Sequence, residues 1–114
     1  MAEKIIRRGD IYWVELPDSN GRELKEIHSC LIISNDRQNN ASPLITVIPI
    51  TSLKAGDKVF SFQVVIKLKK ESVILVDQIR TIDRDKFKDK FDKIDNQLLE
   101  EVERKIRFVL ALKN

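Results

Sequence analysis

The chain has 114 residues, of which 42% are hydrophobic and 34% are charged, and its formal net charge is +3 at pH 7. The hydrophobic share excludes a disordered chain, and the high charge, with no apolar run of about 18 residues, excludes a membrane-spanning protein. The length suits one domain, so we expect residues 1–114 to form a single domain. A single cysteine and a single histidine, with no secretory signal pattern at the N-terminus, predict a reduced, cytoplasmic protein with no metal site.

The predicted elements begin with three β-strands, at residues 11–16, 30–34 and 44–51. Alternation in the first strand places Tyr12 and Trp13 on opposite sides. A turn-rich cluster then starts a polar loop, residues 17–28, which is long enough to indicate a functional role. Pro49 lies inside the third strand and indicates an edge or a bulge there.

Further strands are predicted at residues 59–69, 72–76 and 89–94, with a turn or short helix at 84–87. The first of these has the clearest alternation in the chain. Residues 77–83 continue the strand 72–76 with mostly polar side chains. Residues 96–112 predict a helix, because apolar side chains recur on one face and Asp95 or Asn96 precedes them as a cap.

Five or six strands followed by one helix predict an α+β fold. An antiparallel sheet of this size must bend strongly or close to protect its edges. We therefore expect a small, strongly bent antiparallel β-barrel with a C-terminal helix that covers its open face.

The candidate chemistry lies near strand ends. The chain has no phosphate-cradling glycine motif, no HExxH, no CxxC and no Gly-x-Ser-x-Gly elbow, so no cofactor is predicted. His28, the single histidine, is either a proton-transfer group or a loop residue without a role. Thr51 and Ser52 either bind a phosphate oxygen or cap a turn.

Other polar and aromatic residues have two readings each. Residues 77–83 either contact nucleic acid or connect the sheet to a loop through Arg–Asp pairs. Trp13 and Tyr12 either stack on bases or belong to the core or an interface. Cys30, in an apolar strand, is expected to be inert. Residues 52–70 carry five lysines and one aspartate, which indicates either a basic face or solvated lysines on an exposed strand.

The order of four sequence blocks resembles the MazF/PemK family of toxin endoribonucleases from bacterial toxin–antitoxin systems. The blocks are residues 7–14 (RRGDIYWV), 31–36 (LIISND), 47–52 (VIPITS) and 73–83 (VILVDQIRTID). The resemblance implies an SH3-like barrel with a C-terminal helix. It also implies a homodimer that binds single-stranded RNA and cleaves it without a metal, by attack of a ribose 2′-hydroxyl on the adjacent phosphate. The implied products are a cyclic phosphate and a 5′-hydroxyl, and the implied partner is an antitoxin with an acidic tail that folds on binding.

The resemblance also implies roles for individual residues. The family's catalytic threonine matches Thr51, and its catalytic arginine, usually followed by proline, falls on His28, followed by Ser29. We therefore expect His28 to act as general acid or base and Thr51 as a phosphate donor. The residues expected to contact RNA or supply positive charge are Arg8, Ser52, Asp77, Gln78 and Arg80. We expect Lys67, Lys69 and Lys70 to add a salt-dependent attraction to RNA.

Two other functions remain open on the sequence. One is a toxin that inhibits a protein, as in the CcdB family of gyrase poisons, which has a similar fold. The final residues 110–114 favour helix packing rather than the target contact of that family. The other is an RNA-binding module with impaired catalysis, since His28 stands at the arginine position. Cleavage of naked RNA by the purified protein distinguishes both from a ribonuclease.

Overall fold

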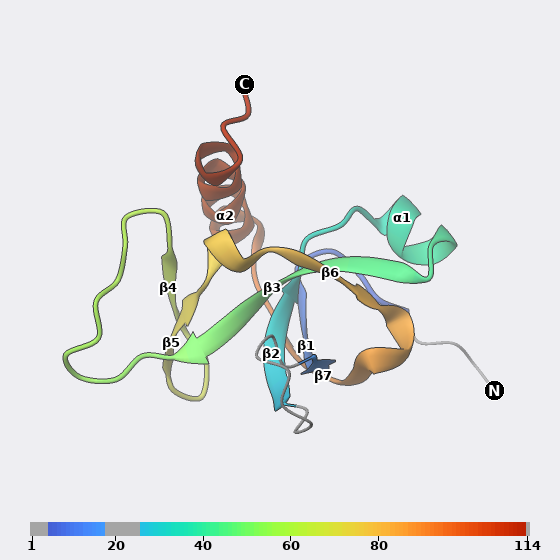
Figure 1. Ribbon diagram of the computed structural model, residues 1–114, viewed down its shortest axis with the longest axis horizontal. Coiled ribbons are helices and arrows are strands. Elements are labelled where there is room, and N and C mark those ends of the chain that lie inside the picture. Colours follow the sequence, from blue (N-terminus) through green and yellow to red (C-terminus); the bar gives the residue numbers. More distant parts are fainter. Residues whose placement is uncertain (1–4, 18–25, 114) are drawn as a thin grey trace.

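The fold consists of one antiparallel sheet, two helices and two 3₁₀ turns (Figure 1). The computed structural model describes residues 5–17 and 26–113. The strands are β1 (Asp10–Leu16), β2 (Glu26–Ile32), β3 (Leu44–Ser52), β4 (Val64–Lys67), β5 (Glu71–Ile74), β6 (Arg80–Asp83) and β7 (Phe87–Lys93). The helices are α1 (Asp36–Ala41) and α2 (Asn96–Val109), and the 3₁₀ turns are η1 (Val76–Gln78) and η2 (Arg84–Lys86).

The strands follow the order β4-β5-β3-β2-β1-β7, and β6 pairs with β3. Strand β3 serves two partners on one side: its first half pairs with β6 up to Val47, and its end pairs with β5 from Ile50 onward. Pro49 lies between these two pairings, where its missing N–H costs no ladder hydrogen bond, and its carbonyl accepts from Leu75 N at 3.0 Å. The predicted bent sheet with a C-terminal helix is confirmed, and the described strands form an open sheet rather than a closed barrel.

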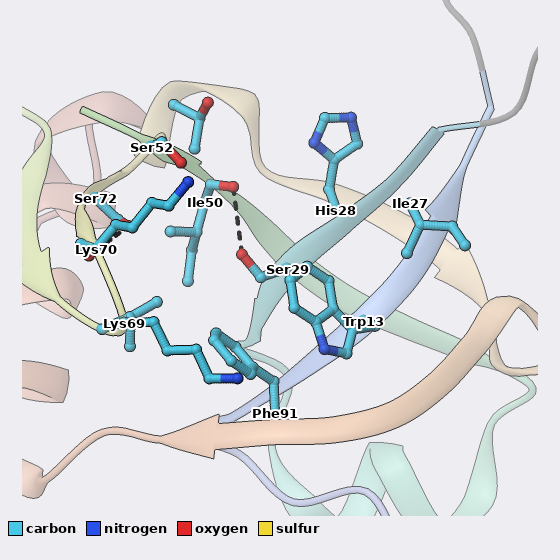
Figure 2. Close-up of a pocket in the computed structure, with 12 residues that line it drawn as sticks. Trp13, Ile27, His28, Ser29, Ile50, Ser52, Lys69, Lys70, Ser72 and Phe91 are labelled. Atoms are coloured by element: carbon cyan, nitrogen blue, oxygen red, sulfur yellow. Dashed lines mark hydrogen bonds between the residues drawn. The ribbon is translucent and has the colours of Figure 1, made fainter. Parts of the chain in front are cut away.

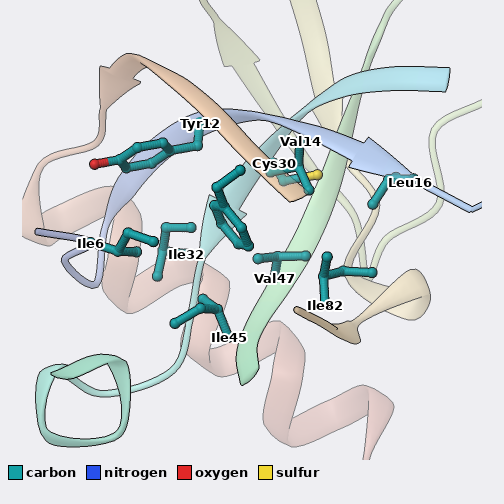
Figure 3. Packing of buried hydrophobic residues seen from close by; sticks show 10 residues of the cluster. Ile6, Tyr12, Val14, Leu16, Cys30, Ile32, Ile45, Val47 and Ile82 are labelled. Carbon is teal, nitrogen blue, oxygen red and sulfur yellow. The ribbon is translucent and has the colours of Figure 1, made fainter. Parts of the chain in front are cut away.

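Both faces of the sheet are covered. The first core cluster comprises Ile6, Tyr12, Val14, Leu16, Cys30, Ile32, Ile45, Val47, Ile82 and Phe87 (Figure 3). The second core cluster comprises Ile11, Leu31, Ile48, Ile50, Val64, Ile66, Ile74, Val76 and Val102. Neighbours along a strand belong to different clusters, as the two-residue period of a strand requires. Helix α2 covers the second cluster through its buried Val102.

Helix α2 begins as predicted and ends three residues early. The Asp95 carboxylate accepts from Leu98 N at 2.8 Å, which confirms the N-cap. At the other end Ala111 adopts a left-handed conformation with φ 57°. The Leu112 N–H then donates to Arg107 O and the Ala111 N–H to Phe108 O, so the helix closes in a Schellman motif.

Two predicted strands were wrong in extent. One is the strand 72–76, which was expected to continue through residues 77–83 and which η1 interrupts. Of residues 59–69, only Val64–Lys67 forms a strand, because Phe60 N donates to Gln63 Oε1 and Gln63 N donates to Phe60 O in a turn. The alternating Phe60 and Phe62 stack on each other with centroids 5.3 Å apart. Residues 36–41, for which no helix was predicted, form α1, which Asn35 caps by accepting from Gln38 N.

The remaining segments agree with their predictions more closely. Residues 84–86 form the predicted short helix as η2, and the predicted strand near residues 89–94 is β7. Most of the predicted polar loop, residues 18–25, lies outside the described residues. No helix within the described ranges is both long and apolar enough to cross a bilayer.

Candidate active site at the end of strands β2 and β3

His28 and Thr51 lie at the point where the pairing of β2 and β3 ends. Ser29 and Ile50 form the terminal pair, and His28 and Thr51 are each one residue beyond it. On its other side β2 continues to pair with β1, where His28 faces Val14. His28 is therefore the third residue of β2, inside the strand rather than at the loop junction that the sequence indicated.

Strand alternation places His28, Thr51 and Arg80 on one face of the sheet. His28 is two residues before Cys30, and Arg80 is two residues before Ile82; both of these neighbours belong to the first core cluster. Thr51 is four residues after Val47 of the same cluster. Side chains an even number of positions apart in a strand share a face. The three groups that the sequence singled out for proton transfer, phosphate donation and positive charge thus extend the first core cluster toward the end of the sheet.

The positive charge of Arg80 acts on the interior of this face. Burial raises the pKa of the Cys30 thiol to about 12, and the Arg80 charge lowers it by a smaller amount. Cys30 is fully buried in the first core cluster, as expected for an inert thiol. The Arg80 guanidinium donates from Nε to Gln78 O at 3.3 Å and from Nη2 to Gln78 Oε1 at 3.5 Å, which orients Arg80 by a glutamine rather than by an aspartate.

A pocket of about 330 Å³ opens beside His28 and Thr51 (Figure 2). Its lining comprises Trp13, Ile27, His28, Ser29, Ile50, Thr51, Ser52, Leu68, Lys69, Lys70, Ser72 and Phe91. Among the described residues that line it, two are lysines and none is acidic. This combination of cations, hydroxyls and apolar walls suits a phosphorylated ligand.

One end of the pocket is aromatic. The Trp13 and Phe91 ring centroids are 4.7 Å apart, and Lys69 Nζ lies 5.6 Å from the Phe91 centroid. Trp13 is 36% exposed, whereas Tyr12 is buried in the first core cluster. The two adjacent aromatics therefore differ: Tyr12 is core, and Trp13 faces the pocket. Sequence reasoning missed Phe91, because only the fold pairs β7 with β1 and brings Phe91 against Trp13.

Four predicted site residues, Arg8, Asp77, Gln78 and Arg80, lie outside this pocket. Asp77 and Gln78 are exposed on η1. Arg8 is engaged inside the protein: its backbone N donates to Asp36 Oδ1 at 2.8 Å, its Nε donates to Ile33 O at 3.0 Å, and its guanidinium pairs with Glu103. The structure brings together His28, Thr51 and Ser52 and places Arg80 on the same face as the first two. Within the described ranges, no three His, Cys, Asp or Glu residues group closely enough to hold a metal ion.

Comparison with known proteins identifies the family. Residues 7–110 match the sequence model described as PemK-like, MazF-like toxin of type II toxin-antitoxin system. This chain belongs to that family. It is 34% identical to Endoribonuclease EndoA of Bacillus subtilis, over 95% of this chain and 97% of that protein. It is 35% identical to Endoribonuclease MazF of Staphylococcus saprophyticus, over 95% of this chain and 93% of that protein.

Solved structures of MazF proteins share the fold of this family member. A MazE–MazF structure from Deinococcus radiodurans matches with a TM-score of 0.80 at 23% identity, over 97% of this chain and all of that chain. A mycobacterial endoribonuclease in complex with its cognate antitoxin matches with a TM-score of 0.77 at 16% identity, over 96% of this chain and 98% of that chain. The bent sheet with its C-terminal helix is therefore the MazF architecture.

Proposed function

We propose that this MazF/PemK family member is an endoribonuclease toxin that cleaves single-stranded RNA. His28 and Thr51 are its proposed catalytic residues. The observation that carries the proposal is that both residues lie one position beyond the last β2–β3 pair, on the same face of the sheet, and border a cationic pocket. A histidine and a hydroxyl at the border of a pocket that contains lysines supply a proton carrier and donors for the phosphate, the groups that phosphodiester cleavage needs.

The reaction transfers a phosphoryl group from the 5′-oxygen of one nucleotide to the 2′-oxygen of the preceding ribose. The ribose 2′-oxygen attacks the adjacent phosphorus as the bond from phosphorus to the 5′-oxygen breaks. His28 carries a proton, either from the 2′-hydroxyl or to the leaving 5′-oxygen. The Thr51 hydroxyl donates to a phosphoryl oxygen, and the positive charge of Arg80 stabilises the developing negative charge. The products are a 2′,3′-cyclic phosphate and a 5′-hydroxyl.

Further contacts hold the RNA strand. Ser52 lies on the pocket lining next to Thr51, and Lys69 and Lys70 add charge there. The exposed Asp77 and Gln78 offer acceptors and an amide for base edges on the neighbouring η1. Arg8, with its three internal contacts, is proposed to act on RNA binding only by fixing the framework.

The proposed partners follow from the relatives. One solved structure of the same fold contains MazE with MazF, and another contains an endoribonuclease with its cognate antitoxin. We extend such a partner to this chain as a short acidic antitoxin, and we propose a homodimer that acts on mRNA in the cytoplasm. The absence of acidic residues among the described pocket lining favours a negatively charged partner of either kind.

Cleavage of a long single-stranded RNA in EDTA tests the proposal. The wild type is expected to give fragments with cyclic phosphate and 5′-hydroxyl ends, which enzymatic end-labelling distinguishes. His28→Ala is expected to lower the rate by about 10²–10⁴-fold. If the wild type binds RNA without cutting it, the protein is an RNA-binding module. If it neither binds nor cuts RNA, a protein target of the CcdB kind becomes the account to pursue.

A further inference from the structure

Three side chains form a row across the sheet inside the pocket. Ser29 of β2 pairs with Trp13 of β1 on one side and with Ile50 of β3 on the other. Directly opposed residues of antiparallel strands point to the same face, so these three side chains lie together. The face is opposite to that of His28, and Figure 2 shows the imidazole pointing away from Ser29 and Trp13.

The Trp13 end of the row has the composition of a base-stacking site. The indole is partly exposed, Phe91 supports it at 4.7 Å, and Lys69 lies over the Phe91 ring. Aromatic rings beside cations bind single-stranded nucleic acid, because the ring stacks on a base while the cation attracts the phosphates.

Two buried hydroxyls supply polar contacts at the same place. Ser29 Oγ donates to Ile50 O at 3.5 Å, and Ser72 Oγ donates to Lys70 O at 3.0 Å. Because each hydroxyl hydrogen is used by a backbone carbonyl, the oxygen lone pairs are left as acceptors. A base edge next to Trp13 would meet these acceptors inside an otherwise apolar wall.

We propose that this pocket takes one base of the RNA strand, stacked on Trp13 with its edge read by Ser29. The inference rests on the proposed ribonuclease function and adds a specificity site to it.

Trp13 is the only tryptophan of the chain, so its fluorescence reports on this pocket alone. The probe is a short single-stranded RNA made uncleavable by 2′-O-methyl groups and titrated against the protein. We expect the Trp13 emission to change on binding, and we expect an abasic nucleotide at one position of the probe to abolish that change. Trp13→Ala should weaken binding about tenfold, whereas Phe108→Ala, which removes a 68% exposed ring elsewhere, should not.

Ser29→Ala tests the reading of the base edge and preserves the small buried side chain. Cytosine and uracil have the same size and differ at this edge. Loss of one hydrogen bond should therefore change the ratio of their affinities, at the position identified with the abasic probe, by about fivefold. Both variants are also compared with the wild type for the bases at which a long RNA is cut.

The outcomes separate this inference from the function on which it rests. Cleavage by the wild type with no change in Trp13 emission, and with unchanged base preference in both variants, overturns the base pocket and leaves the ribonuclease standing. Emission that responds to an acidic peptide but not to the oligonucleotide also overturns it, in favour of a peptide occupant. Failure of the wild type to bind or cut RNA removes both.

Discussion

The guanidinium of Arg8 forms an ion pair with the carboxylate of Glu103, which joins the segment before β1 to the middle of α2. The same arginine donates to Ile33 O, at the end of β2, and its backbone N donates to the Asp36 carboxylate at the start of α1. One residue, through its backbone N–H and its side chain, thus connects the end of β2 with both helices. Its place in the RRGD block is explained by these framework contacts.

Arg8→Ala is expected to lower the free energy of unfolding by about 1–3 kcal/mol, because it leaves the half-buried Glu103 and the Ile33 carbonyl without a donor. Urea denaturation measures the change. Arg7→Ala, at the exposed neighbouring position, is the matched control and should stay within about 0.5 kcal/mol of the wild type. Equal stability of the two variants would contradict the framework role.

Thr51→Ala should reduce RNA cleavage by about 10²-fold, as removal of one preorganised donor does. Thr51→Ser keeps the hydroxyl and should retain most of the rate. Thr81→Ala removes an exposed threonine on β6 and controls for a general loss of surface hydroxyls. Single-turnover rates on one RNA settle the point; a Thr51→Ala enzyme as fast as Thr51→Ser would exclude the hydroxyl from the reaction.

Lys69 and Lys70 line the pocket, whereas Lys67, three residues from Lys70, is exposed on β4 outside it. Each cation that neutralises a phosphate contributes about 0.7 to the slope of log affinity against log salt for a single strand. Lys69→Gln and Lys70→Gln should each reduce the slope by about this amount, and Lys67→Gln should change it little. Equal effects of all three would mean that the attraction is diffuse rather than centred on the pocket.

The raised pKa of the buried Cys30 thiol makes the free energy of unfolding depend on pH above about pH 9. The thiol ionises near pH 9 in the unfolded chain and near 12 in the folded one, because burial raises its pKa. Between these values only the unfolded state loses the proton, so the free energy of unfolding falls by about 1.4 kcal/mol per pH unit. Burial also raises the pKa of Tyr12, which acts in the same direction. Cys30→Ala should make the fall shallower, measured by thermal denaturation from pH 8 to pH 11; a slope equal to that of the wild type would rule out the thiol as its source.

The sequence correctly predicted those elements that depend only on interactions between residues close together in the chain. The α2 cap at Asp95, its start and its apolar stripe are local, and they are correct. The alternation of apolar residues wrongly predicted a strand at residues 59–63. Phe60 and Phe62 are spaced as in a strand, but they stack on each other in a loop. The joint assignment of His28 and Thr51 to one site came from the resemblance to the family. The contact between Trp13 and Phe91 joins β1 to a strand over seventy residues away, so it depends on the final topology.

A pH–rate profile of RNA cleavage in EDTA, for the wild type and His28→Arg, tests the central claim most directly. Arginine stays charged across the accessible pH range, whereas imidazole titrates within it. The account predicts a pH-dependent inflection in the wild-type rate, and a His28→Arg enzyme that cuts the same RNA without that inflection. Superimposable profiles for the two proteins would contradict a proton-transfer role for His28.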